Sequence, residues 1–195
     1  PLGVLKAGCT YQPLDPTYPE ERLNFMMKDA GARYLIADRD LRHLVTEYEG
    51  ETLFTDEIAG LPDGDASAVE VNAEDRMVLL YTSGSTGVPK GCEILHRNVV
   101  SFCHMSTEMT HLDASSRMSA YASFGFDAHL MDVVSPVLTG AEVHVIPEEI
   151  RLDLMALNDY FNENGITHAF MTTQVAYQFA TSDIPNKSLK YFLTG

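Results

Sequence analysis

Residues 81–91 read Tyr-Thr-Ser-Gly-Ser-Thr-Gly-Val-Pro-Lys-Gly, and this stretch decides how the whole chain is interpreted. The apolar run 77–80 before it is typical of a buried strand, so residues 81–91 are expected to form a loop leaving a sheet. Its glycines let backbone N–H groups approach anionic oxygens closely, its hydroxyl groups add donors, and Lys90 adds a positive charge. We therefore expect the loop to bind a phosphate chain. On composition alone, an ordinary surface turn rich in Ser, Thr and Gly is the alternative.

This loop differs from the two commonest phosphate-binding loops. A Walker loop has a glycine before its lysine and a hydroxyl residue after it, whereas this chain has Pro89 and Gly91 at those places. The dinucleotide-binding pattern needs three glycines, and only Gly84 and Gly87 have a relevant spacing. Pro89 also stiffens the loop directly before the lysine. The sequence thus indicates a phosphate-binding loop of another kind.

The charge balance argues against several classes of partner. The 195 residues include 28 acidic and 13 basic side chains, which gives a net charge of −15. Such a charge argues against nucleic acid and against an anionic membrane as partners. No apolar run approaches the roughly 18 residues of a membrane span, and no signal peptide opens the sequence. The three cysteines and seven histidines show no metal-ligand spacing, so we predict no metal site, and reduced thiols in a cytoplasmic protein.

Extended and helical patterns alternate along the chain, which predicts an α/β fold. Mixed, mostly parallel sheets with flanking helices are expected, because strand–helix–strand order is typical of parallel βαβ units. Residues 1–75 are predicted to form a first sheet lobe, and residues 76–195 the loop and the βαβ units. The predicted strands are 33–37, 52–54, 77–81, 91–96, 117–122, 142–146, 166–171 and 189–194, and the predicted helices are 19–30, 38–48, 98–109, 127–138, 150–164 and 174–180.

Three strings together resemble one enzyme family. Residues 81–91 resemble the phosphate-binding signature of the adenylate-forming superfamily, which includes acyl-CoA synthetases, luciferases and the adenylation domains of nonribosomal peptide synthetases. Residues 5–23, Leu-Lys-Ala-Gly-Cys-Thr-Tyr-Gln-Pro-Leu-Asp-Pro-Thr-Tyr-Pro-Glu-Glu-Arg-Leu, resemble a stretch typical of the peptide-synthetase members. Phe126-Asp127-Ala128 resembles the Phe-Asp that opens the family's amino-acid pocket. Because the three strings follow the family's order, the chain is identified as a member of the peptide-synthetase adenylation domains.

The resemblance implies a fold, a reaction and partners. The chain would be an internal fragment of the large N-terminal subdomain, part of the layered adenylate-forming core. The parent enzyme would use ATP and Mg²⁺ to convert an amino acid to aminoacyl-AMP and pyrophosphate. It would then load the phosphopantetheine thiol of a peptidyl carrier protein, beside a condensation domain. The catalytic lid lysine and most Mg²⁺ ligands would lie outside these 195 residues, so no catalytic residue is assigned and the fragment alone is expected to be inactive.

The resemblance also implies which residues bind ATP and substrate. Asp127 would pair with the substrate α-ammonium group, because an unpaired buried charge is costly; the alternative is that Asp127 caps the following helix. Phe126 would be either a core residue or an aromatic gate near the thiol tunnel. The phosphate contacts would come from Thr82, Ser83, Gly84, Ser85, Thr86, Gly87 and Lys90, and the substrate contacts from Phe126, Asp127, Ala128, Met131, Phe170, Leu193 and Gly195.

The apolar character of the expected pocket predicts a hydrophobic, aliphatic amino acid as substrate. Two departures from the family pattern affect the register of that pocket: His129 stands where Ser is common, and Thr172-Thr173 where a proline pair is frequent. Two other functions stay open. An acyl-CoA or aryl-acid ligase would share the loop but would not need Asp127, and a non-catalytic module would fold without turnover.

Overall fold

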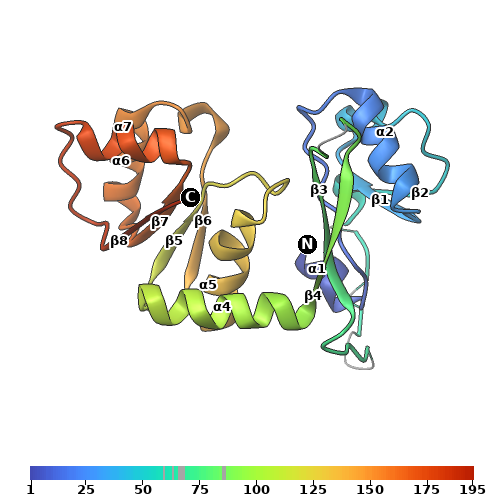
Figure 1. Cartoon of the computed structure of the whole chain (residues 1–195), viewed down its shortest axis with the longest axis horizontal. Coiled ribbons are helices and arrows are strands. Elements are labelled where there is room, and N and C mark those ends of the chain that lie inside the picture. The colour runs from blue at the N-terminus through green and yellow to red at the C-terminus, as the bar shows by residue number, and fades with distance from the viewer. Residues whose placement is uncertain (59, 63, 66–68, 85–86) are drawn as a thin grey trace. The chain divides into compact units, whose positions relative to one another are not determined.

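The computed structural model describes residues 1–58, 60–62, 64–65, 69–84 and 87–195 (Figure 1). The chain divides into two compact units, Pro1–Arg97 and Asn98–Gly195, which are described separately below. Both units contain strands and helices, and the three strand pairings of the four-stranded sheet are all parallel, so the predicted α/β class is confirmed. The contacts group the strands around the phosphate loop with the first unit, whereas the sequence analysis grouped them with the later βαβ units.

The first unit is built around helix α2 (Glu20–Asp29), which follows the short helix α1 (Leu2–Lys6). Strands β1 (Tyr34–Ala37) and β2 (Glu51–Phe54) form a two-stranded parallel sheet, and α3 (Thr55–Ile58) follows β2. The helix and this sheet share a core, because an amphipathic helix must bury its apolar side. The buried residues of that core are Leu23, Met27, Leu35, Val45 and Tyr48.

The predicted helix over residues 38–48 is wrong in type and length, because the structure has a 3₁₀-helix, η1 (Arg39–Leu44). Arg42 provides the physical reason. Its guanidinium donates hydrogen bonds to the carbonyl oxygens of Val45 (2.6 Å) and Tyr48 (2.8 Å), and Val45 leaves the helical conformation with a ψ of 69°. These bonds stabilise a tight turn at the point where the helix was expected to continue.

A β-hairpin completes the first unit. Strand β3 (Arg76–Thr82) and strand β4 (Lys90–Leu95) pair in antiparallel fashion. Tyr11 adds a parallel bridge on the other side of β3, where its N–H donates to the Met77 carbonyl and its carbonyl accepts from the Leu79 N–H. The predicted strand before the loop and the predicted return to a sheet after it are both observed.

The second unit contains a four-stranded parallel sheet. Its strands are β5 (Arg117–Ala120), β6 (Glu142–Val145), β7 (His168–Met171) and β8 (Tyr191–Thr194), in the order β6-β5-β7-β8. The connections contain η2 (Leu130–Val134), α5 (Ser135–Thr139), η3 (Glu148–Ile150), α6 (Leu154–Asn164) and α7 (Thr173–Thr181). The predicted parallel βαβ units are therefore confirmed.

The two faces of this sheet are covered by different helices (Figure 1). Ala169 and Met171 of β7 belong to a core shared with Phe161 of α6 and Phe179 of α7. On the opposite face, the ring of His168 bonds through Nε2 to the Thr110 carbonyl of α4 (His96–Thr110) at 3.0 Å. Because successive side chains of a strand point to opposite faces, Phe170 lies on the same face as His168.

The helix expected over residues 127–138 is observed at residues 128–139, but its middle turn, η2, is π-helical and runs directly into α5. Pro136 is the physical reason, since proline has no N–H to donate and its ring crowds the carbonyl four residues earlier. A widened turn ahead of Pro136 relieves that crowding. Gly140 (φ 77°) and Gly165 (φ 62°) end α5 and α6 in the left-handed conformation, which glycine adopts readily.

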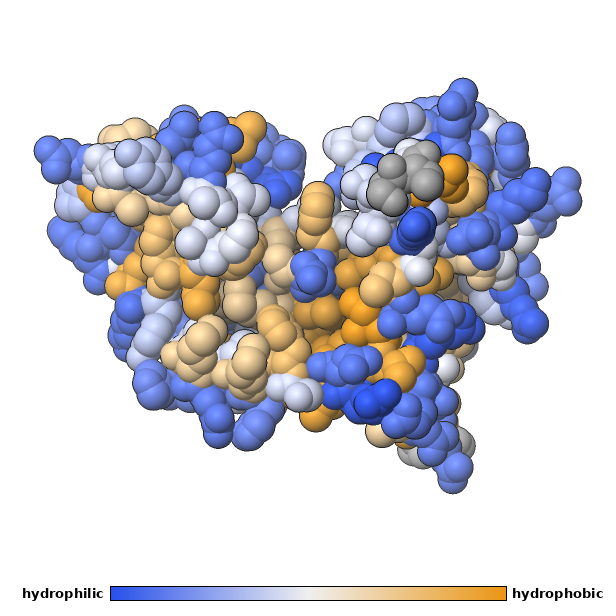
Figure 2. Space-filling view, viewed as in Figure 1, coloured by the Kyte–Doolittle hydropathy of each residue, from blue (hydrophilic) through white to orange (hydrophobic). Residues whose placement is uncertain are grey.

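The surface of the molecule carries both charged and hydrophobic side chains (Figure 2). Phe126 is among the large apolar residues that are well exposed, with 64% of its surface accessible. Within the part of the chain that the structure describes, no helix has the length and apolar character needed to cross a membrane.

Candidate functional site

The predicted phosphate loop is the connection between β3 and β4. Thr82, the last residue of β3, is paired with Lys90, the first residue of β4. The loop therefore starts after Thr82 and returns to the hairpin at Lys90. Thr82, Ser83, Gly87 and Lys90 are exposed. Ser85 and Thr86, which the sequence analysis also assigned to phosphate binding, lie outside the described residues.

Two glycines of the loop have different structural roles. The N–H of Gly87 donates to the Gly84 carbonyl at 2.9 Å, and Gly87 has a φ of 81°, a conformation that side chains disfavour. Gly84 is required for a different reason: a Cβ atom there would lie 2.2 Å from the Val88 carbonyl oxygen. The loop therefore folds back on itself at Gly84 more tightly than any other residue would allow.

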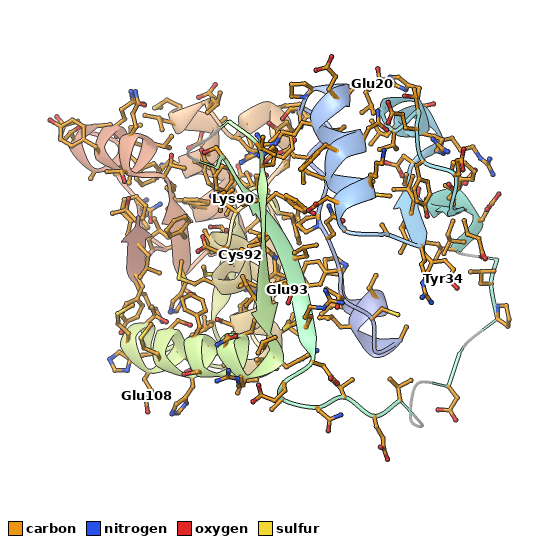
Figure 3. All side chains as sticks on the ribbon, turned by 45° about the vertical axis from the view of Figure 1, so that its right-hand side comes forward. Glu20, Tyr34, Lys90, Cys92, Glu93 and Glu108 are labelled. Atoms are coloured by element: carbon orange, nitrogen blue, oxygen red, sulfur yellow. The ribbon has the colours of Figure 1, made fainter. Side chains whose placement is uncertain are left out.

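Lys90 supplies the positive charge of this loop. Figure 3 shows Lys90 at one end of β4, with Cys92 and Glu93 further along the strand. Glu93 is paired with Arg76 at 2.8 Å, whereas the ammonium group of Lys90 has no recorded ion pair within the described part of the chain. An exposed ammonium group beside backbone N–H donors is suited to bind an anion.

The strand that enters the loop is anchored by a residue that the sequence analysis did not single out. The hydroxyl of Tyr81 donates to the Asp29 carboxylate of α2 at 2.8 Å and also lies 3.4 Å from the Met26 carbonyl. Tyr81 is buried, with 6% of its surface accessible. Burial and the nearby Asp29 raise the pKa of Tyr81, so this phenol stays protonated and remains a donor.

Three of the predicted pocket residues meet at the carboxyl ends of β7 and β8. Phe170 and Leu193 are directly paired in the parallel register, and a Cβ atom at Gly195 would lie 3.6 Å from the Phe170 ring. Tyr191 stacks on His168 with ring centroids 4.8 Å apart, so Tyr191 and, two residues on, Leu193 share the α4 face of the sheet with Phe170.

The remaining pocket residues follow β5, the neighbour of β7. Phe126 and Asp127 are exposed in the segment that connects β5 to η2, and Ala128 and Met131 are half-buried. The carboxyl ends of parallel strands lie along one edge of a sheet, which is where ligands bind in open α/β folds. Asp127 directly precedes Ala128, the first residue of the helical segment, so its substrate-binding role and its helix-capping role both stay predictions.

The comparison with known proteins decides the family. The profile of the family described as AMP-binding enzyme matches residues 1–195. The chain belongs to the AMP-binding enzyme family. It is 39% identical to surfactin synthase subunit 1 of Bacillus subtilis (strain 168) over an alignment that covers all of this chain and 6% of the relative. It is also 39% identical to bacitracin synthase 1 of Bacillus licheniformis, with 100% of this chain and 4% of the relative covered.

Solved structures agree with the fold. A four-domain nonribosomal peptide synthetase bound to AMP and glycine matches 97% of this chain and 14% of its own, with a TM-score of 0.78 and 24% identity. A second synthetase, bound to α-methyl-L-serine-AMP, matches 93% of this chain and 21% of its own, with a TM-score of 0.78 and 22% identity. The resemblance to peptide-synthetase adenylation domains is therefore confirmed, and the chain spans a small part of the relatives that it matches.

Within this member of the AMP-binding family, the two departures from the usual pattern have structural explanations. His129 is buried, with its Nδ1 2.5 Å from the Phe126 carbonyl and its ring 5.0 Å from that of Phe124. Burial lowers the pKa of His129, so the ring is neutral at neutral pH. Thr173 donates through Oγ1 to the Gly195 carbonyl at 3.1 Å, which ties α7 to the end of β8.

A buried carboxyl in η2 is the second feature that sequence reasoning missed. Asp132 has 0% of its surface accessible and lies in the turn that follows Asp127. Its position inside an apolar run, between Met131 and Val133, was the available signal, because an unpaired acid is rare at such a place. Among the described residues, no group of three or more His, Cys, Asp and Glu side chains could hold a metal ion.

Proposed function

We propose that the protein containing this chain activates an amino acid with ATP. In this reaction a substrate carboxylate oxygen attacks the α-phosphorus of ATP, a C–O–P linkage forms, and the bond to the leaving pyrophosphate breaks. The products are aminoacyl-AMP and pyrophosphate. The family membership supports the use of an adenine nucleotide, and the peptide-synthetase relatives support an amino acid as the acyl group.

The hairpin loop would hold the β- and γ-phosphates of ATP. Thr82, Ser83, Gly84, Gly87 and Lys90 would contribute hydroxyl groups, close backbone approach and one positive charge, and we assign the same role to Ser85 and Thr86. Phosphoryl displacement needs correct positioning and neutralisation of developing charge more than it needs covalent chemistry from the protein. Mg²⁺ bound to the ATP oxygens would supply further neutralisation against the acidic overall field of this chain.

The observation that carries the amino-acid assignment is the placement of Asp127. This carboxylate lies beyond the carboxyl end of β5, next to the strand whose end carries Phe170 paired with Leu193. An ammonium group brought into an apolar pocket needs a carboxylate partner, because an isolated buried charge is costly. Apart from Asp127, the assigned pocket residues Phe126, Ala128, Met131, Phe170, Leu193 and Gly195 are apolar, which favours a hydrophobic side chain on the substrate.

The further steps follow the peptide-synthetase relatives. We propose that the aminoacyl group passes from AMP to the phosphopantetheine thiol of a peptidyl carrier protein. The thiolate would attack the acyl carbon, a thioester would form, and AMP would leave. A neighbouring condensation domain would then use the thioester, and the location would be cytoplasmic.

ATP–pyrophosphate exchange by the full-length protein tests this function. A panel of the twenty amino acids, medium-chain fatty acids and benzoate derivatives is supplied one at a time with ATP, Mg²⁺ and labelled pyrophosphate. The proposal predicts exchange above background with one or a few hydrophobic amino acids. Exchange with fatty or aryl acids and with no amino acid would assign the protein to the acyl- or aryl-acid ligases instead.

A further inference from the structure

The carboxyl group of Asp132 holds the backbone at the end of β5. Its Oδ2 accepts hydrogen bonds from the N–H groups of Tyr121 at 2.9 Å and Ala122 at 2.7 Å. Its Oδ1 has no hydrogen-bond partner within the described residues. Burial raises the pKa of Asp132 to about 7, and only the two backbone N–H groups act in the other direction. Burying a carboxyl in an apolar interior is costly when one of its oxygen atoms makes no hydrogen bond.

The two residues that Asp132 holds are the first two of a closed loop. Strand β5 ends at Ala120, and the chain then passes through Phe126 and Asp127 before η2 brings it back to Asp132. Asp132 thus joins the far end of this segment to its start.

Local bonds keep the segment between those ends compact. The Gly125 N–H donates to the Ser123 hydroxyl at 3.2 Å, and the Phe126 N–H to the Ser123 carbonyl at 3.0 Å. At the other side of the tip, the Leu130 N–H donates to the Asp127 carbonyl at 2.9 Å. Because the interior of the loop is bonded in this way, a shift at its start moves the tip residues with it.

The side chain of Arg151 also binds Tyr121, the first residue of this loop. Its Nη2 donates to the Tyr121 carbonyl at 2.8 Å, and the Tyr121 hydroxyl donates back to the Arg151 carbonyl at 3.0 Å. The guanidinium carbon lies 5.0 Å from the centre of the Tyr121 ring, and Glu148 pairs with the Arg151 Nη1 at 2.8 Å. The N–H and the C=O of Tyr121 are therefore both bound by side chains from elements outside β5.

We propose that Asp132 is a positioning residue for amino-acid binding: it fixes the start of the 121–129 loop, and with it the place of Phe126 and Asp127. This inference rests on the proposed function, because it concerns the same amino-acid site. An apolar residue at position 132 would avoid the cost of burying a carboxyl but would leave two backbone N–H groups unpaired. The energetic cost of burying this carboxyl is explained if a fixed loop position contributes more to amino-acid binding than the carboxyl takes from the stability of the core.

The test is a comparison of Michaelis constants in the full-length protein. Asp132→Ala removes the acceptor, Asp132→Asn keeps a carbonyl oxygen that can accept both N–H bonds, and Asn158→Ala is the matched control. Asn158 is also buried, with 2% of its surface accessible, and bonds the Pro185 carbonyl and the Asn186 side chain, away from the loop. ATP–pyrophosphate exchange gives separate KM values for the amino acid and for ATP in each variant.

The proposal predicts a selective effect. In Asp132→Ala, the KM for the amino acid rises about tenfold or more, while the KM for ATP stays within about twofold, because a displaced binding group weakens only its own contacts. Asp132→Asn restores the amino-acid KM to within about threefold of wild type, and Asn158→Ala leaves both constants unchanged. An unchanged amino-acid KM in Asp132→Ala, or an equal rise in Asn158→Ala, would overturn the proposal.

A second variant decides the question if Asp132→Ala does not fold. Arg151→Met removes the other bond to Tyr121 at a more exposed position, where 26% of the side chain is accessible. A rise in the amino-acid KM of about threefold or more supports the positioning role, and an unchanged KM contradicts it. Failure of the proposed function gives a different result. None of the amino acids would then support ATP–pyrophosphate exchange by the wild-type protein, and the inference would fall as well.

Discussion

Tyr81 and Asp29 join the strand that enters the phosphate loop to helix α2, with the phenol oxygen 2.8 Å from the carboxylate. Tyr81 is the last buried residue before the exposed Thr82 and Ser83. Its ring also packs edge-to-face with the ring of Phe25, with centroids 6.5 Å apart. The exposed loop thus begins at a point that is fixed by one hydrogen bond and by aromatic packing.

Tyr81→Phe should loosen this end of β3 without opening a cavity. Loss of one hydrogen bond at a buried site costs about 1 kcal/mol. We expect amide hydrogen exchange in β3 to become about fivefold faster, as that energy implies for local opening. Tyr34→Phe is the control, because Tyr34 is 66% exposed, and its exchange should match wild type. Equal acceleration in both variants would show that the Tyr81–Asp29 bond does not anchor the strand.

The two glycines of the loop should respond differently to substitution. Gly84→Ala places a Cβ atom against the Val88 carbonyl, so the loop must open, and we expect the KM for ATP to rise about tenfold or more. A Cβ atom at position 87 meets no atom within 4 Å, so Gly87→Asn mainly requires a left-handed conformation, which Asn tolerates. Its effect on the KM for ATP should be smaller. A larger effect at Gly87 than at Gly84 would contradict the steric explanation.

Asp153 should stabilise the start of α6. Its Oδ1 accepts the N–H groups of Met155 at 3.0 Å and Ala156 at 3.1 Å, which is the geometry of a helix N-cap. Asp153→Ala should cost about 1 kcal/mol and speed hydrogen exchange in the first turn about fivefold. Asp159→Ala removes an exposed carboxylate from the middle of the same helix and should leave that exchange within about twofold of wild type.

Asp132 should make the stability of the second unit depend on pH. Its pKa is about 7 in the folded chain and about 3.9 in an unfolded chain. Between those values the folded state retains a proton that the unfolded state has lost, so the free energy of unfolding falls as pH rises from about 4 to about 7. His129 and His168, whose pKa values burial lowers, act with the opposite sign up to about pH 6.5.

A comparison of wild type with Asp132→Asn isolates this contribution, because Asn does not titrate and the histidines are common to both proteins. Cys103 is buried in α4, so the rate at which its thiol is labelled reports opening of the second unit. The labelling rate of wild type relative to Asp132→Asn should increase steadily from pH 4 to pH 7. A constant ratio would mean that Asp132 is ionised throughout that range.

The parts of the fold that the sequence predicts are those governed by a single local pattern. The four strands of the second sheet, the end of α6 at Gly165 and the loop after β3 all follow from alternation, periodicity or a glycine signal. The turn at residues 130–134 does not, because the same apolar spacing fits an α-helix and a π turn, and the choice depends on Pro136. The 3₁₀-helix at residues 39–44 depends on the Arg42 bonds, which join residues that no pattern connects.

The candidate site divides in the same way. The phosphate loop is one continuous string, and the pairing of Phe170 with Leu193 follows from the expected parallel sheet. The contributions of Tyr81, Asp132 and Arg151 depend on hydrogen bonds between distant segments, such as Asp29 to Tyr81. Of these, only Asp132 left a trace in the sequence, as a single acid within an apolar run.

The role of Asp127 is the central claim, and one exchange measurement tests it most directly. The preferred amino acid and the same acid without its amino group are compared as substrates for wild type and for Asp127→Ala. Because removing one partner of a charge pair that the bound substrate would bury costs roughly 2–5 kcal/mol, the account predicts that wild type prefers the amino acid by about a hundredfold and that Asp127→Ala loses this preference. An Asp127→Ala protein that still prefers the amino acid as strongly as wild type would contradict the account.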